Sequence, residues 1–124
     1  MGAWFRTDDT QAVKKVSEDV FEVVEVVRIV PLNAVTKARF AISYQTIDIA
    51  KYTLGEILDV VSGYGYDSIE ELRTLYGNDY KQIIAECIAE TFWAILEPVF
   101  TDEVAALRYV EDSIVKGKLF TLGG

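Results

Sequence analysis

The chain has 124 residues, of which 51% are hydrophobic, with a single Cys and a formal net charge of −8 at pH 7. This length suits one domain, residues 1–124, whose core needs no disulfide. The N-terminus lacks the basic start and apolar run of a secretory signal, and no apolar stretch is long enough to span a bilayer. We therefore expect a cytoplasmic protein that does not contact a membrane.

The negative charge is concentrated in the second half of the chain. Residues 55–124 carry thirteen acids and five bases, whereas residues 31–54 carry one acid and three bases. Phosphate backbones are bound through Lys and Arg, so direct contact with nucleic acid is disfavoured. The charge favours a protein partner with a basic surface. The alternative is that the acidity only keeps the protein soluble.

In the first half, residues 20–30 contain six Val, one Ile and one Phe. This composition favours a strand buried on both faces, although the Val spacing also fits a helical heptad. Residues 39–49 alternate on one face and predict a second strand, so we expect an antiparallel hairpin. Residues 10–17 precede the hairpin and predict a short helix.

Residues 52–61 fit two structures. Thr53 and Glu56 have the spacing of a capping box, which indicates a helix. The apolar residues after Gly55 would also suit a strand, and we favour a third strand here.

The remainder of the chain predicts helices. A short one begins at Asp67 or Ser68 and ends at Gly77, and another begins at Thr101 and ends at Gly117. The clearest helix lies between them, from Asn78 to Pro98 or Phe100. The predicted fold is therefore α+β, with an antiparallel sheet of about three strands from the first half packed against C-terminal helices. An all-helical bundle is the alternative.

Several kinds of catalytic site are excluded. The chain has no His, which removes the commonest general base and the usual neutral metal ligand. Cys87 lies on the apolar face of its predicted helix, so we expect a buried, unreactive thiol. Gly63-Tyr64-Gly65-Tyr66 lacks the third Gly of a dinucleotide-binding loop and predicts a turn. We expect no cofactor, no metal and no catalytic residue.

One carboxylate pattern offers an enzymatic alternative. Glu22 and Glu25 form an E-x-x-E pair, and Glu56 and Asp59 form an E-x-x-D pair. On facing helices, such pairs can hold Mg²⁺ through oxygen ligands. In these four acids the chain resembles the all-helical MazG-type nucleotide pyrophosphatases. That resemblance implies a Mg²⁺-dependent enzyme acting on nucleotides.

A row of acidic residues is the candidate binding site. Glu86, Glu90, Trp93 and Glu97 follow the 4, 3, 4 spacing of one helix face, and we call them the acidic row. Trp is frequent at binding hot spots, so we expect this row to contact a basic protein or a second copy of the chain. Alternatively, Trp93 packs beneath another element, such as the Trp4–Phe5 segment or the final helix.

The sequence thus favours a non-enzymatic, acidic interaction protein. Proteins of this composition can inhibit nucleic-acid-binding proteins by presenting carboxylates where phosphates would lie. Inhibitors encoded by phage or mobile elements act in this way, and this analogy rests on composition alone.

Overall fold

The computed structural model describes residues 4–6, 10–29, 39–92 and 95–115. The chain forms a five-stranded antiparallel sheet in which the strands lie side by side in sequence order. This confirms the predicted α+β class, with a sheet packed against later helices, and the all-helical alternative is wrong. The sheet has five strands instead of the expected three or so, and the last of them comes from the second half of the chain. The strands are β1 (Trp4–Arg6), β2 (Gln11–Lys15), β3 (Val20–Ile29), β4 (Arg39–Asp48) and β5 (Ile95–Phe100).

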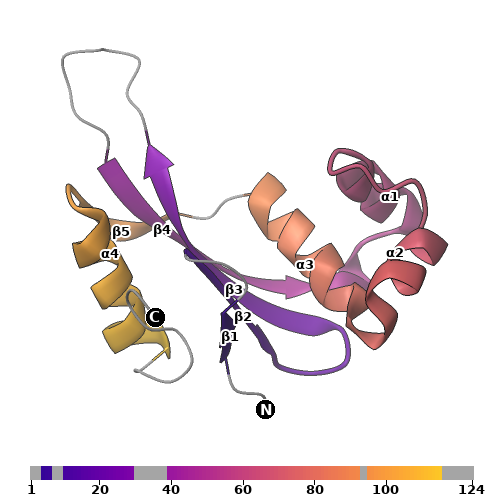
Figure 1. Ribbon diagram of the computed structural model, residues 1–124, viewed down its shortest axis with the longest axis horizontal. Coiled ribbons are helices and arrows are strands. Elements are labelled where there is room, and N and C mark those ends of the chain that lie inside the picture. Colours follow the sequence, from indigo (N-terminus) through magenta and orange to yellow (C-terminus); the bar gives the residue numbers. More distant parts are fainter. Residues whose placement is uncertain (1–3, 7–9, 30–38, 93–94, 116–124) are drawn as a thin grey trace.

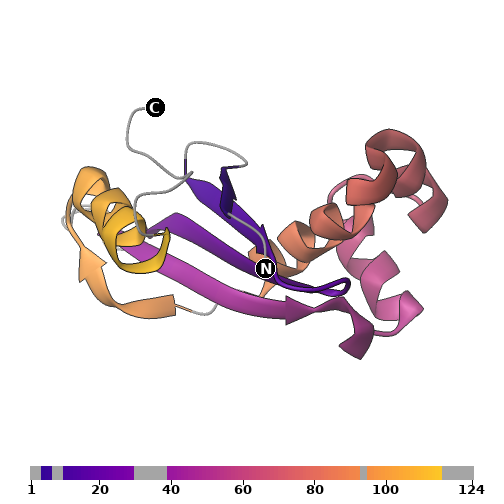
Figure 2. The same ribbon diagram turned by 90° about the horizontal axis from the view of Figure 1, so that it is seen from below.

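Helices lie on both sides of this sheet. Figure 1 shows α1, α2 and α3 gathered at one side and α4 at the other, and the turned view in Figure 2 keeps them apart. None of the helices in the described part of the chain is long and apolar enough to cross a bilayer. The helices are α1 (Leu54–Ser62), α2 (Ile69–Tyr76), α3 (Tyr80–Thr91) and α4 (Glu103–Tyr109). Short 3₁₀-helices lie at Ile49–Lys51 and Gly77–Asp79, and α4 continues into a π-helix at Val110–Val115.

The β3–β4 hairpin is the centre of the sheet and confirms the two strands expected there. Val20 pairs with Asp48 at one end, and Ile29 pairs with Arg39 at the other. Phe21 and Val24 are both buried, on opposite faces of β3. A strand covered on both faces explains why so few polar residues interrupt this run.

Each face of the sheet has its own hydrophobic core. The α1–α3 core lies between the sheet and the first three helices, and the α4 core lies between the sheet and the last one. The α1–α3 core comprises Val13, Phe21, Val23, Ile47, Ile49, Ile57, Val61, Leu72, Ile84, Ala85, Cys87, Ile88 and Ala89. The α4 core comprises Ala12, Val24, Val26, Ile42, Ala106 and Val110.

The helix predicted over residues 10–17 is wrong, because Gln11–Lys15 forms β2. Ala12 lies opposite Val24 and belongs to the α4 core, whereas Val13 lies opposite Val23 and belongs to the α1–α3 core. Consecutive side chains are thus buried on opposite faces, as the period of two in a strand requires. Pairing with β3 decides the structure here.

The strand favoured over residues 52–61 is also wrong, because Leu54–Ser62 is α1. The capping box that indicated a helix is complete. The Glu56 backbone N–H donates to Thr53 Oγ1 at 3.1 Å, and the Thr53 N–H donates to Glu56 Oε1 at 2.8 Å. Two backbone N–H groups at the start of the helix, which have no carbonyl partner within it, are therefore hydrogen-bonded by nearby side chains.

The long helix predicted from Asn78 is correct only in its first part. α3 ends at Thr91, and residues from Ile95 onward pair with β4, with Ile95 opposite Ser43 and Phe100 opposite Phe40. Pro98 cannot donate a ladder hydrogen bond, but β5 is an edge strand, where Pro is tolerated. Residues 95–100 have a local pattern that fits a helix, but they form a strand because they pair with the edge of β4.

The other two predicted helices are present. α2 is capped by Ser68, whose side chain accepts from the Glu71 N–H, and ends at Gly77, where φ is +60°. α4 begins after Asp102 rather than Thr101, because the Asp102 carboxylate accepts from the Val104 N–H at 3.0 Å. The end predicted at Gly117 lies outside the described residues.

Candidate functional site

The C-terminal ends of α1 and α3 meet at an open groove of about 570 Å³, which we call the α1–α3 groove. From α1 and the loop after it come Asp59, Val60, Gly63 and Tyr64. From the end of α3 come Thr91 and Phe92. Two segments roughly thirty residues apart in sequence therefore form one surface feature.

Local hydrogen bonds hold the α1 side of the groove. After the helix the chain turns back, and the N–H groups of Tyr64 and Tyr66 both donate to the Val61 carbonyl, at 3.0 and 3.1 Å. Gly65 has φ of +92°, in the left-handed region that L side chains rarely adopt. This confirms the turn expected for residues 63–66, and it places Tyr64 beside the end of α3.

The α3 side is fixed in a similar way. Thr91 Oγ1 donates to the Cys87 carbonyl at 2.8 Å and lies 3.5 Å from the Tyr64 hydroxyl. The Phe92 N–H donates to the Ile88 carbonyl at 3.0 Å and closes the last turn of the helix. The two helix ends are thus linked across the groove by a hydroxyl pair.

Two aromatic side chains in the groove are open to solvent. Phe92 is 54% exposed and Tyr64 is 42% exposed. Exposed rings that lie together leave apolar area in water and are typical of contact surfaces. Tyr64 and Phe92 therefore form a candidate contact surface at the groove.

The described charged residues at the ends of α1 and α3 are acidic. Neither α1 nor α3 has a basic residue in its last turn, so nothing within these helices offsets the partial negative charge of their C-terminal carbonyls. Asp59 lines the groove and Glu90 lies in the last turn of α3. Within the described part of the chain, neither carboxylate forms an ion pair.

The positive charges of this region are engaged elsewhere. Residues 52–92 carry eight acids and only two bases, Arg73 and Lys81. Arg73 pairs with Glu70 at 2.9 Å. Lys81 pairs with Asp19 at 2.8 Å and with Glu18 at 3.4 Å, which ties the start of α3 to the turn between β2 and β3.

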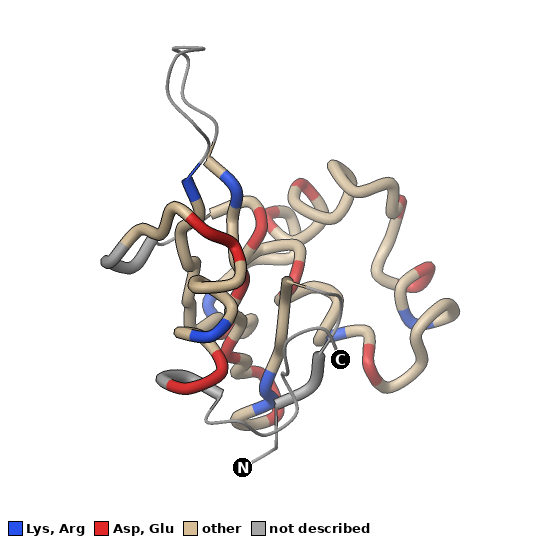
Figure 3. The backbone as a smooth tube through the Cα atoms, turned by 60° about the vertical axis from the view of Figure 1, so that its left-hand side comes forward, with Lys and Arg blue, Asp and Glu red and all other residues tan. Residues whose placement is uncertain are grey.

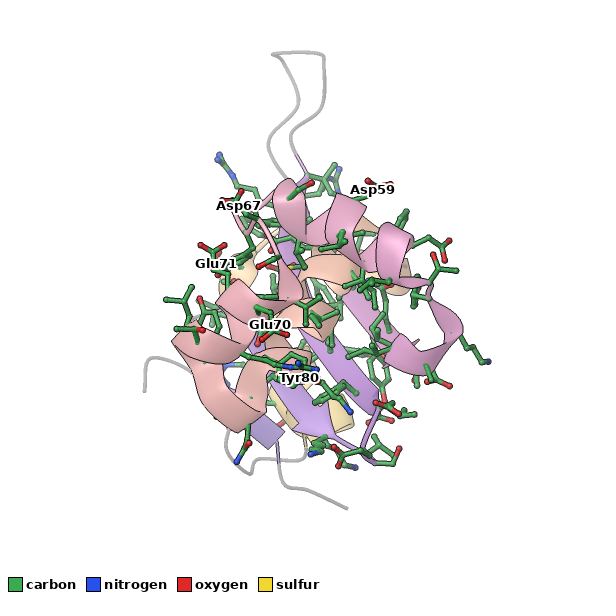
Figure 4. All side chains as sticks on the ribbon, turned by 90° about the vertical axis from the view of Figure 1, so that its right-hand side faces the viewer. Asp59, Asp67, Glu70, Glu71 and Tyr80 are labelled. Carbon is green, nitrogen blue, oxygen red and sulfur yellow. The ribbon has the colours of Figure 1, made fainter. Side chains whose placement is uncertain are left out.

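Acidic residues occur on the helices and also on the strands of the sheet. Figure 4 shows Asp59 on α1 apart from Asp67, Glu70 and Glu71, which lie at the start of α2. Figure 3 shows acidic positions spread over helices, strands and turns, and basic positions flanking the connection between β3 and β4. The groove lies in the segment formed by residues 52–92, where acids outnumber bases.

Two titratable groups near α3 hold their protons strongly. Cys87 is buried, as expected, and its burial and the charges of Glu86 and Glu90 raise the pKa of the thiol to about 11. The hydroxyls of Tyr66 and Tyr76 are 2.6 Å apart, and chiefly this hydrogen bond raises the pKa of Tyr66 to about 12. Neither group is an activated nucleophile at neutral pH.

Two residues of the predicted acidic row, Glu86 and Glu90, lie together on one helix. Glu86 and Glu90 lie one turn apart on α3, where Glu86 is half-buried and accepts from the Gln82 side chain at 3.2 Å, and Glu90 is exposed. Trp93 lies outside the described residues, and Glu97 belongs to β5. The prediction that all four share one helix face is wrong, because α3 ends at Thr91.

The four acids of the enzymatic alternative are dispersed. Glu22 and Glu25 are three residues apart on strand β3, so they lie on opposite faces of the sheet. Glu22 lies 4.0 Å from Lys14, and burial together with the Glu22 charge raises the pKa of Tyr44. Glu56 caps α1, and Asp59 lines the groove. Within the described residues, no three potential metal ligands lie close together.

Tyr64 and Phe92 are the site residues that the sequence prediction missed. Tyr64 was assigned to a turn and Phe92 to the interior of a helix, so neither was expected at a surface feature. The sequence does contain one signal for them. Two helical segments end without Lys or Arg, and an aromatic residue follows each end: Tyr64 near the first and Phe92 directly after the second. Comparison with protein-family models, with curated proteins and with solved structures finds no match to this chain.

Proposed function

We propose that this protein acts by binding a basic protein partner through the α1–α3 unit, and that it catalyses no reaction. The observation that carries the proposal is the placement of Asp59 and Glu90 near two helix C-termini that contain no compensating cation. Carboxylates in that position oppose the dipoles of their own helices. Because these carboxylates do not stabilise their own helices, a role in binding is a reason for them to be there.

The charge balance supports the same partner chemistry. Both cations of residues 52–92 are held in internal ion pairs, so the surplus of acids determines the field outside this unit. Such a field accelerates encounter with a positively charged surface and weakens with added salt. The partner we favour is a nucleic-acid-binding protein, whose phosphate-binding surface would meet the carboxylates instead.

A pair of charge-matched variants tests this proposal. Glu86→Gln with Glu90→Gln removes two charges from α3, and Glu103→Gln with Asp112→Asn removes two exposed charges on the α4 side. Association rates of the full chain with a panel of basic nucleic-acid-binding proteins would be measured at low and high salt. We expect slower association and a weaker salt dependence for the α3 pair only.

Two results would contradict the proposal. Equal effects of both pairs would show that net charge alone governs association. An absence of salt-dependent association with every member of the panel at low salt would remove the basic partner. Sedimentation of the protein alone, in the same buffers, would reveal self-association through this surface.

A further inference from the structure

The α1–α3 groove combines two features that suit one kind of side chain. It presents two exposed aromatic residues, Tyr64 and Phe92, and it lies at the negative ends of two helices beside Asp59. Aromatic faces and carboxylates both attract cations, and a cation that contacts both gains from each. An apolar side chain would use the rings but leave the negative charge uncompensated.

The shape of the cation follows from the groove. The groove is open and contains Val60 as well as the two rings, so it favours a flat, weakly hydrated group over a compact, strongly hydrated one. The guanidinium of arginine is planar and stacks on aromatic rings, whereas the ammonium of lysine keeps its water more strongly. The Asp59 carboxylate can accept two parallel N–H donors from a guanidinium.

We propose that the α1–α3 groove binds an arginine side chain of the basic partner, which contacts Tyr64 and Phe92 and pairs with Asp59. This inference rests on the proposed function, since it assigns the position at which that partner is anchored. It adds a specificity that general acidity cannot provide. A partner with lysine at this position would bind more weakly than one with arginine at the same net charge.

The direct test uses a short peptide with one arginine among neutral residues and a second peptide in which citrulline replaces it. Citrulline keeps the planar shape but removes the charge. Amide shifts of the full-length ¹⁵N-labelled protein would be followed by NMR. We expect the arginine peptide to shift Gly63, Gly65 and Phe92, the citrulline peptide to leave them unchanged, and a lysine peptide to bind about three- to tenfold more weakly.

Variants separate the groove from the rest of the acidic surface. Asp59→Asn and Phe92→Leu should each weaken binding of the arginine peptide by about three- to tenfold. Leu75→Ala is the matched control, because Leu75 is 59% exposed on α2 and does not line the groove. We expect no change for that variant.

The outcomes distinguish this inference from the proposed function. Shifts spread evenly over the acidic residues, with no effect of Phe92→Leu, would overturn the groove as an arginine site. If the α3 charge pair still slows association with a basic protein, the proposed function survives that result. Self-association that Phe92→Leu abolishes would identify a second copy of the chain as the occupant and would also overturn the inference.

Discussion

The helices α3 and α4 lie on opposite sides of the sheet and place their charges in opposite ways. α4 begins with Asp102 as its cap and Glu103 in its first turn, and it has Arg108 in its last turn. Asp102 and Glu103 complement the helix dipole, whereas after Arg108 the helical backbone continues as the π-helix Val110–Val115. α3 has no acid in its first turn and no base in its last turn, where Glu90 lies instead.

An acidic residue can therefore stabilise or destabilise its own helix, depending on the end at which it lies. The acids at the start of α4, like Glu70 and Glu71 at the start of α2, stabilise the helices that carry them. Glu90 has no such role, since its charge opposes the end of its own helix. We therefore base the proposed binding surface on acids that are unfavourable to their own helix, and not on total acidity.

The largest expected effect concerns the cores beneath the two helices. Ile88→Ala removes a fully buried side chain of α3, and we expect it to lower the free energy of unfolding by about 2–5 kcal/mol. Val110→Ala in the α4 core removes a smaller side chain and should cost about 2 kcal/mol or less. Urea denaturation checks both values. A larger loss for Val110→Ala would show that the α4 core dominates stability.

The next prediction concerns Cys87, which lies in the α1–α3 core. The thiol should react slowly with a thiol reagent in the folded protein and rapidly after denaturation, because it is only 7% exposed. Rapid labelling of the native protein would contradict the burial of this face of α3. No comparable probe exists on α4, since Cys87 is the only Cys in the chain.

The raised pKa of Cys87 also predicts a dependence of stability on pH. Burial holds the thiol protonated up to about 11, whereas its ordinary pKa is 9.0. Below pH 9 both states are protonated and stability is unaffected; between pH 9 and 11 only the unfolded thiol ionises, so stability falls as pH rises. Cys87→Ala should flatten this part of the curve. The raised pKa of Tyr66 acts in the same direction at higher pH, so a fall that persists in the variant above pH 10 is expected.

A smaller effect is expected at the start of α1. Thr53→Ala removes the side chain that accepts from the Glu56 N–H, and it should cost about 1 kcal/mol. Asp102→Ala removes the corresponding cap of α4 and should cost a similar amount. Thermal or urea unfolding checks both. An effect near zero for Thr53→Ala would show that α1 is held by packing alone.

The smallest effects test the comparison most directly, because they differ in sign. Glu90→Gln should raise the free energy of unfolding by about 0.3–1 kcal/mol, since it removes a charge that opposes the dipole of α3. Glu103→Gln should lower it by a similar amount, since Glu103 favours the start of α4. Paired urea titrations at low salt would measure both. Changes of the same sign would mean that the dipole does not distinguish these positions.

The sequence predicted those parts of the fold whose signals are local or very strong. β3 followed from a Val-rich run that suits burial on both faces, and α2 followed from Ser68 and Gly77 at its ends. β2 and β5 were missed because their structure is decided by pairing with β3 and β4. A short segment with a helical pattern becomes a strand when a neighbouring edge supplies its hydrogen bonds.

The candidate site was harder to predict for a related reason. Glu86 and Glu90 were identified because their spacing on one helix is a local property. Tyr64 and Phe92 lie just beyond two helix ends, and their proximity depends on how α1 packs against α3. The sequence contains both aromatics but not the angle between the helices that brings them together.

The place of α1, α2 and α3 in the chain, between strands β4 and β5, has a consequence for the order of folding. β3 and β4 are close in sequence, and Ile29 at the end of β3 pairs with Arg39 at the start of β4. In contrast, Ser43 of β4 pairs with Ile95 of β5, and α1, α2 and α3 all lie between these two residues in the chain. Closing the longer loop costs more chain entropy, and distant pairings form slowly. We therefore expect the hairpin and the first three helices to assemble early, with the outer strand and α4 added afterwards. During synthesis, the α1–α3 groove would then be complete before the opposite face of the sheet is covered.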